Sequence, residues 1–244
     1  MLEGLYAAAS GMEAQQQQLD AIGNDLANAS TTGYKAERVG FRELLYNQVD
    51  LAGTVTTQGA GAAAQTIGRD QAQGSIQSTG NPLDVAIEGP GFFTVRRPGG
   101  TVALTRDGSL QVNAKGQLTT AEGALLDPPL TLPRGSSPSE VAISPDGTVS
   151  VGTKTIGRLA LVTVASPDHL LAAGGNLFTA NASSGRPRPT PGATIKQGAL
   201  EGSNVDVGND MVQMMGAQRS YQLESSAIQT ENQMLSIANQ LVTS

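Results

Sequence analysis

Few residues in this 244-residue chain are of types and spacings that suggest catalysis. His169, the only histidine, lies in the loop-like run Ser166-Pro167-Asp168-His169. A Ser-His-Asp triad would have to use it, and we expect a structural or solvent-exposed histidine instead. Asp84, Glu88 and Asp107 are the alternative, because paired carboxylates can hydrolyse glycosidic bonds. Solvated turn carboxylates are the far commoner reading of such residues.

Motifs that would support catalysis or cofactor binding are missing. The sequence contains no G-x-S-x-G, G-x-x-x-x-G-K, G-x-G-x-x-G or H-E-x-x-H pattern. It also has no cysteine, which excludes disulfides and thiolate metal sites. We therefore predict no catalytic residues, no cofactor and no metal.

The composition argues against several classes of binding partner. The formal net charge is −6, the pI is near 4.8 and no basic cluster occurs, which argues against a nucleic-acid partner. Only 3% of residues are aromatic, so a large aromatic-lined pocket is not expected. No apolar run approaches membrane-spanning length, and we predict no direct membrane insertion. The first basic residue is Lys35, so the start does not resemble a cleaved secretory signal.

The elements that must position any functional residue begin with two terminal helices, expected over residues 2–29 and 205–242. Both carry the same seven-residue apolar repeat, which in a helix keeps one narrow stripe facing a partner helix. The predicted packing seam consists of Leu5, Met12, Leu19, Leu26, Met214, Tyr221, Ile228 and Leu235. Polar residues such as Gln218 and Asn232 alternate with it in the second helix, where they can specify register.

Between the helices, short apolar runs are separated by turn dipeptides such as Asp107-Gly108 and Asp146-Gly147, which indicates β-hairpins. The predicted fold is α+β, with the N- and C-terminal helices pairing as a coiled-coil-like axial domain around a central all-β domain. The predicted ranges are 1–46 for the first helix and its turn, 47–81 for a Gly/Ala/Gln-rich linker or extended arm, 82–182 for the β domain, 183–202 for a Pro/Gly-rich return linker and 203–244 for the last helix.

The seam residues have a simpler interpretation as well. Met and Leu at helical spacing usually form an intramolecular core, and the two ends could pair only with each other. Thin seams, however, leave much helix surface uncovered and favour lateral packing between copies. A head-to-tail interface that does not close would produce a helical filament.

Several ordered blocks resemble the bacterial flagellar rod and hook axial proteins. The run from Asn24 to Lys35 is similar to the N-L-A-N-x-x-T-x-G-[FY]-K signature after the first helix of that family. Its motif turn comprises Asn24, Asn28, Thr32, Gly33, Tyr34 and Lys35, and we expect Gly33 to adopt a positive φ. Further similar blocks lie at 82–93, 105–108, 200–205 and 211–221.

The resemblance implies a structural subunit without enzymatic activity, most like the distal-rod members. Terminal helices would pack into a hollow helical homopolymer that transmits torque and passes exported subunits, with the β domain outside. Implied partners are other rod and hook proteins, basal-body ring proteins and the flagellar export apparatus, which would export the chain to the periplasmic basal body without cleaving a signal peptide.

Three alternatives stay open. The stretch 47–81 is shorter than the corresponding distal-rod segment, which leaves a proximal-rod or hook-type subunit possible. A surface adhesin on a coiled-coil stalk would use the β domain to bind a ligand. A β-rich glycan hydrolase would lose activity on changing Asp84 or Asp107 alone.

Overall fold

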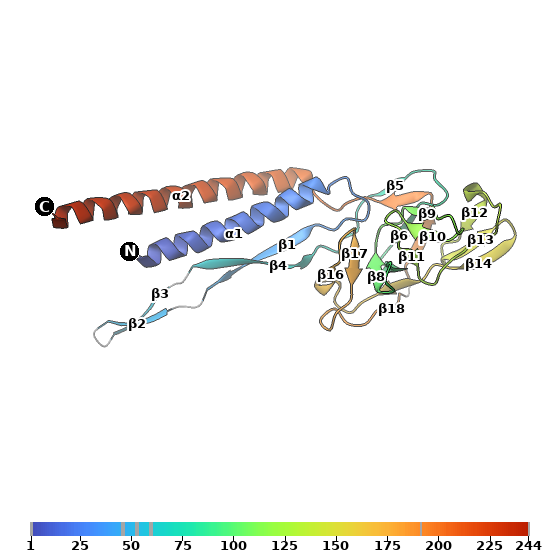
Figure 1. Cartoon of the computed structure of the whole chain (residues 1–244), viewed down its shortest axis with the longest axis horizontal. Helices are drawn as coiled ribbons and strands as arrows, with labels where there is room; N and C mark the ends of the chain where they lie inside the picture. Colours follow the sequence, from blue (N-terminus) through green and yellow to red (C-terminus); the bar gives the residue numbers. More distant parts are fainter. Residues whose placement is uncertain (1, 45–46, 52–53, 59–60, 191, 244) are drawn as a thin grey trace. The chain divides into compact units, whose positions relative to one another are not determined.

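The computed structural model describes the chain except residues 1, 45–46, 52–53, 59–60, 191 and 244 (Figure 1). It divides into two compact units. The helical unit comprises 1–27, 37–67 and 206–244, and the β unit comprises 28–36 and 68–205. The α+β class is confirmed, with terminal helices that contact each other and a central antiparallel β region.

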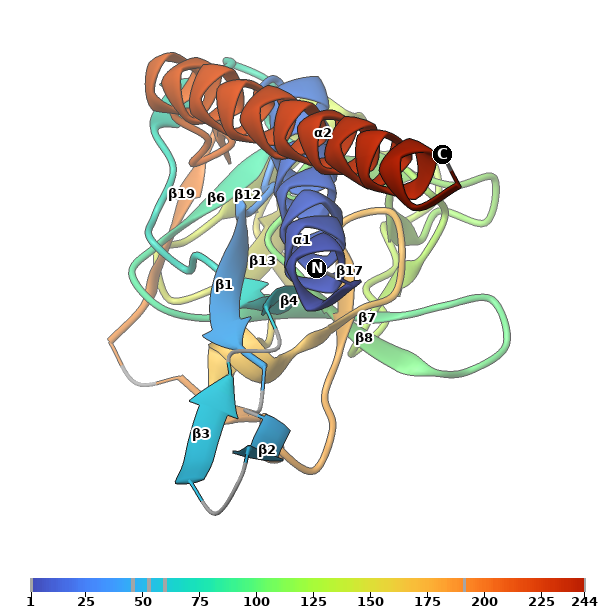
Figure 2. The same cartoon turned by 90° about the vertical axis from the view of Figure 1, so that its left-hand side faces the viewer.

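In the helical unit, α1 (Leu2–Ala27) packs against α2 (Val207–Thr243). Figures 1 and 2 show them side by side and antiparallel, with the start of α1 and the end of α2 at the same end of the pair. Asp206 is the N-cap of α2, because its Oδ1 accepts hydrogen bonds from the backbone N–H groups of Gly208 and Asn209, each at 3.1 Å.

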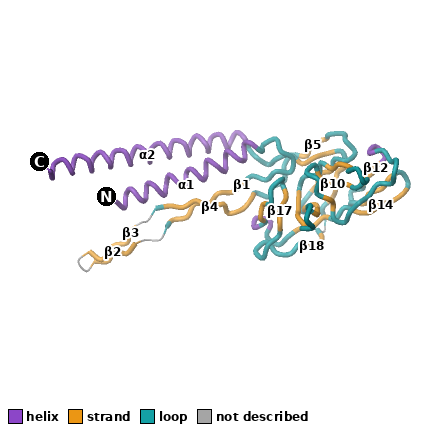
Figure 3. Tube along the Cα trace, viewed as in Figure 1, coloured by secondary structure: helices purple, strands orange, loops and turns teal. Residues whose placement is uncertain are grey.

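Strands extend alongside α1 in the same unit. β1 (Glu37–Glu43) contacts α1 and pairs with β4 (Ala62–Arg69), whose last two residues belong to the β unit. β2 (Asn47–Leu51) and β3 (Thr54–Gln58) form an antiparallel hairpin. The stretch expected as a linker or extended arm thus contains strands, drawn in orange in Figure 3.

The β unit is built from short antiparallel strands. Its largest sheet has the order β16-β17-β8-β7-β11-β10-β9, with β15 joining β7 to β18. The strands of that sheet are β7 (Phe92–Arg96), β8 (Val102–Thr105), β9 (Leu110–Val112), β10 (Leu118–Thr120), β11 (Leu125–Leu126), β15 (Leu161–Thr163), β16 (Leu171–Ala172), β17 (Leu177–Thr179) and β18 (Arg188–Pro189).

Smaller sheets complete the β unit. β12 (Val141–Ile143), β13 (Thr148–Val151) and β14 (Lys154–Arg158) form one of them. At its first hairpin, Gly147 has a φ of +89°, as the Asp146-Gly147 dipeptide predicts. The 3-10 turns are η1 (Pro138–Glu140) and η2 (Pro167–His169).

The return segment takes part in the β unit. β19 (Thr194–Gln197) pairs with β6 (Val85–Glu88), and β20 (Ala199–Glu201) pairs with β5 (Ile76–Ser78). Residues 183–202, expected as a linker, therefore supply strands that cover the edges of earlier ones.

The main core cluster of the β unit is aliphatic apart from Phe93. Val85, Ile87, Val95 and Leu118 are fully enclosed in the main cluster. A second cluster surrounds an edge-to-face contact between the rings of Phe92 and Phe178, whose centroids lie 6.1 Å apart. This core holds in place the polar groups described next.

Candidate functional site

The motif turn lies in the β unit, apart from Asn24 at the end of α1. The Thr31 hydroxyl donates to Asn28 Oδ1 at 3.2 Å and the Thr31 amide to the Asn28 carbonyl at 3.0 Å, so Asn28 shapes the turn locally. The Thr32 hydroxyl donates to Asp107 Oδ1 at 3.0 Å, while the Thr32 carbonyl accepts from Asn176 Nδ2 at 3.0 Å. The turn is thereby bonded to two distant loops.

Gly33 confirms the predicted backbone conformation, with a φ of +66°. A Cβ at this position would lie 2.7 Å from the backbone carbon of Arg106 and 2.7 Å from the nitrogen of Asp107. The Gly33 amide donates to the carbonyl of Glu201 at 2.8 Å. Glycine is required here both for its positive φ and for the close approach of another chain segment.

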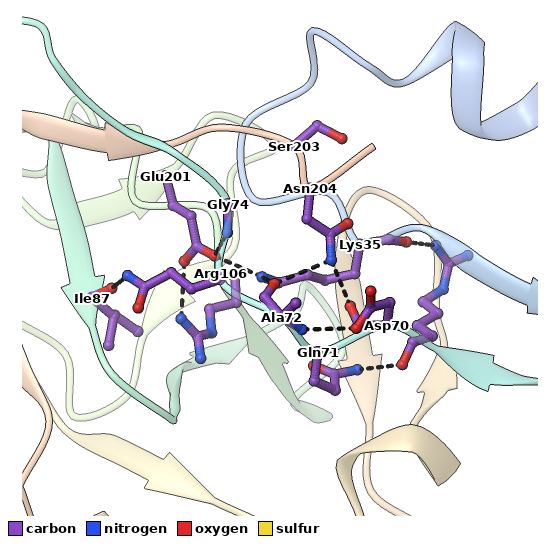
Figure 4. Close-up of polar contacts among 12 residues, drawn as sticks. Lys35, Asp70, Gln71, Ala72, Gly74, Ile87, Arg106, Glu201, Ser203 and Asn204 are labelled. Atoms are coloured by element: carbon purple, nitrogen blue, oxygen red, sulfur yellow. Dashed lines mark hydrogen bonds and ion pairs between the residues drawn. The ribbon is translucent and has the colours of Figure 1, made fainter. Parts of the chain in front are cut away.

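A buried ionic cluster follows at Lys35 (Figure 4). Lys35 Nζ donates to Glu201 Oε1 at 2.6 Å and to the carbonyl of Ala72 at 2.7 Å. Arg106 Nη1 donates to Glu201 Oε2 at 2.9 Å, and the Gly74 amide donates to Glu201 Oε1 at 3.0 Å. The carboxylate of Glu201 thus balances both cations and accepts a backbone hydrogen bond.

Burial controls the electrostatics of this cluster. The side chains of Lys35 and Glu201 are fully buried and that of Arg106 is 4% exposed. Desolvation lowers the pKa of Lys35 below its usual range, while the hydrogen bond and the charge of Glu201 oppose that shift. Because these side chains are buried, removing the carboxylate would leave two uncompensated cations.

Neighbouring side chains also contact residues 34–36. The Arg69 guanidinium lies 5.3 Å from the ring centroid of Tyr34, and its Nη1 donates to the Lys35 carbonyl at 2.8 Å. Asn204 Oδ1 accepts from the Ala36 amide at 2.8 Å, and its Nδ2 donates to the carbonyl of Asp70 at 2.9 Å. Arg106, Glu201 and Asn204 lie in the blocks 105–108 and 200–205 that carry the family resemblance. The sequence did not predict their contacts with the motif turn, because nothing local links them to it.

The contact between α1 and α2 follows a seven-residue register. A Cβ at Gly11 would lie 2.9 Å from Glu224 Oε1, and one at Gly4 would lie 3.4 Å from Glu231 Oε2. These glycines therefore make room for carboxylates of α2. Burial raises the pKa of Glu224, and it raises that of Asp210 together with the nearby charges of Asp25 and Asp206.

The predicted seam residues occupy varied environments. Leu5, Met12, Leu19, Leu26, Met214 and Ile228 are half-buried. Tyr221 is 38% exposed, and the side chain of Leu235 is outside the described residues. In α1, the most buried side chains are Ala14, Ile22 and Asp25.

The face of α2 that points away from α1 carries large apolar side chains. Ala217 is buried at 4% exposure, and residues about half a turn around the helix from it are open. We call this the outer stripe of α2: Val212, Met215, Arg219, Leu223, Met234 and Ile237. Large apolar side chains that are this exposed are a common feature of interaction surfaces.

The structure gives little support to the two catalytic alternatives, a triad that uses His169 and a pair of hydrolytic carboxylates. His169 is exposed at the end of η2. Asp84 accepts hydrogen bonds from Thr79 and Asn81 in its own turn. Asp107 accepts one from Ser109 in its own turn and one from the distant Thr32, so the contacts of both carboxylates are structural.

Metal sites and membrane spans were sought in the described part of the chain. Within it, no group of three or more His, Asp or Glu side chains is placed to hold a metal ion. None of the helices, over those same residues, has the length and apolarity to cross a bilayer.

The terminal helices expose an apolar stripe, and the β unit contains buried ion pairs. Such an arrangement is typical of a subunit that assembles into a larger structure. Family models agree with this class. "Flagella basal body rod protein" matches residues 5–35, "Flagellar hook protein FlgE/F/G D1 domain" matches 86–151, and "Flagellar basal body rod FlgEFG protein C-terminal" matches 196–241.

Relatives that match over their whole length identify the family more specifically than the three partial family models. Flagellar basal-body rod protein FlgG of Borreliella burgdorferi is 39% identical, covering 99% of both chains. FlgG of Caulobacter vibrioides is 34% identical over 98% of this chain and 99% of its own, and FlgG of Bacillus subtilis is 34% identical over 96% and 97%. The chain therefore belongs to the family of the flagellar basal-body rod protein FlgG. It is a structural subunit of the flagellar rod and not an enzyme.

Proposed function

We propose that the chain polymerises with copies of itself into the distal part of the rod, a hollow helical tube that transmits torque and passes exported subunits. One observation carries this proposal. The outer stripe of α2 exposes Met215, Leu223 and Ile237 by 51%, 72% and 57%. A monomer gains nothing from that exposure, whereas neighbouring helices in a tube would cover it.

The proposed assembly also implies which proteins the chain contacts and how it is exported. The predicted seam, Leu5, Met12, Leu19, Leu26, Met214, Tyr221, Ile228 and Leu235, would hold helices together within the tube. The β unit would make lateral contacts outside it and meet hook and ring proteins. Export by the flagellar apparatus without signal cleavage is part of the same proposal.

The first experiment is electron microscopy of basal bodies from a strain lacking this gene, with a swimming assay. We expect a truncated rod without a hook and no swimming, with a stub that already contains the proximal rod. A shorter stub would indicate a proximal subunit, and a complete rod without a hook would indicate a hook-type subunit. Complete rods with normal swimming would overturn the proposal.

A further inference from the structure

The charges of the two units are unequal. The helical unit contains eleven Asp and Glu residues but only three basic residues, Arg38, Arg42 and Arg219. Arg38 and Arg42 lie on β1, so Arg219 is the sole cation of the helices. An assembly of such units must bring acidic surfaces together and has few cations with which to balance them.

An acidic pocket of about 270 Å³ lies between α1 and the strands beside it. Asp20 and Ala21 line it from α1, and Glu37 and Val39 line it from β1, with no basic residue among its lining side chains. Asp20 accepts a hydrogen bond from Gln16, and Glu37 accepts one from Thr66, each with one oxygen. Neither carboxylate forms an ion pair with any described residue.

Arg219 has the complementary character. It is exposed on the outer stripe of α2, between Met215 one turn before and Leu223 one turn after. No ion pair or hydrogen bond holds its guanidinium within the described residues. Because the stripe faces away from α1, Arg219 cannot reach the pocket of its own chain.

We propose that Arg219 of one copy inserts into the Asp20–Glu37 pocket of a second copy, so that this ion pair sets the register between neighbouring subunits. This inference rests on the proposed self-assembly. Met215 and Leu223 flank the guanidinium, and Ala21 and Val39 give the pocket apolar walls for the aliphatic stem. Opposite charges inside a partly desolvated contact also reject misaligned copies, in which acid would meet acid.

Crosslinking tests the contact directly, since the chain has no cysteine of its own. Asp20→Cys and Arg219→Cys variants, with different tags, are expressed together in a strain lacking the native gene. Isolated basal bodies are treated with a short bifunctional maleimide, because an arginine ion pair separates Cα atoms farther than a disulfide permits. The control replaces D20C by Tyr6→Cys, an exposed position on the same side of α1, about 21 Å away along the helix.

We expect doubly tagged dimers at least about fivefold more abundant with D20C than with Y6C, because only the former lies within reach. Equal yields from basal bodies that contain both copies would overturn the contact while leaving the rod function intact. If the deletion strain swims normally, the proposed function fails instead, so the two failures are distinguishable.

Charge reversal gives a second readout that does not depend on cysteine. Arg219→Glu should lower the amount of subunit in basal bodies at least about tenfold, and adding Asp20→Arg should restore part of it. Arg42→Glu changes net charge equally on an exposed β1 residue outside the pocket, and we expect near-normal incorporation. Failure of D20R to improve a folded R219E variant would overturn the pairing.

Discussion

Lys35 and Glu201, 166 positions apart, form a fully buried ion pair with 2.6 Å between Nζ and Oε1. It joins Lys35, the last residue of the motif turn, to β20, the last strand before the chain enters α2. Glu201 binds Arg106 as well, so one carboxylate ties together three distant parts of the β unit. This places the structural role of the motif turn inside the β unit.

The first prediction concerns that carboxylate. Glu201→Gln keeps the side-chain shape but leaves two buried cations uncompensated, and we expect a loss of about 3–5 kcal/mol in the free energy of unfolding. Denaturant unfolding of the purified chain measures it. Asp127→Asn is the control, since the exposed Arg96–Asp127 pair should contribute less than about 1 kcal/mol. Similar losses for both variants would contradict a special role of the buried cluster.

A second prediction tests the turn backbone. Gly33→Ala should destabilise the β unit by about 1–3 kcal/mol, through the positive φ and the contact with the backbone of Arg106. Gly123→Ala is matched in conformation, with a φ of +82° and open space around a Cβ, and we expect a cost of about 1 kcal/mol. Thermal unfolding compares them, and an equal effect would show that the close approach is unimportant.

The third prediction concerns pH and the helix pair. Raised pKa values of Asp210 and Glu224 mean that the folded pair binds more protons than the unfolded chain above the ordinary values of 3.8 and 4.5. Stability of the pair should therefore fall as pH rises through that window and be regained on acidification. Melting of the helical circular dichroism signal between about pH 4 and pH 7 measures it.

Glu224→Gln is the variant for this test. It removes one of the two titrating groups, so its melting temperature should be higher than that of the native chain at neutral pH and depend less on pH. Glu13→Gln, on the exposed side of α1, is the control and should retain the native profile. An unchanged profile for E224Q would exclude Glu224 as a source of the pH dependence.

A fourth prediction addresses the seam. Leu26→Asp or Ile228→Asp should abolish incorporation into basal bodies, because a carboxylate at a half-buried helix position opposes packing between helices. The β unit should still fold, seen as an unchanged protease-resistant fragment of the full chain. Ile228→Leu conserves volume and should swim normally. Normal motility of the Asp variants would contradict a packing role.

Much of the architecture was accessible from local pattern. The seven-residue repeats predicted α1 and α2, and turn dipeptides such as Asp146-Gly147 predicted hairpins, because helix period and turn conformation depend on neighbouring residues. The stretches 47–81 and 183–202 were harder. Their composition is that of linkers, but β19 and β20 form because earlier strands offer them edges, which is a long-range effect.

The sequence by itself determined the α+β class, the position of the terminal helices and the assignment to an axial, non-enzymatic family. The tertiary structure alone decided which side of α2 meets α1, where Gly4 and Gly11 accommodate Glu231 and Glu224, and which side remains open around Arg219. It also decided that Lys35, Arg106 and Glu201 share one buried cluster. Periodicity is local along the chain, whereas pairings between distant residues depend on the path of the folded backbone, which no short pattern records.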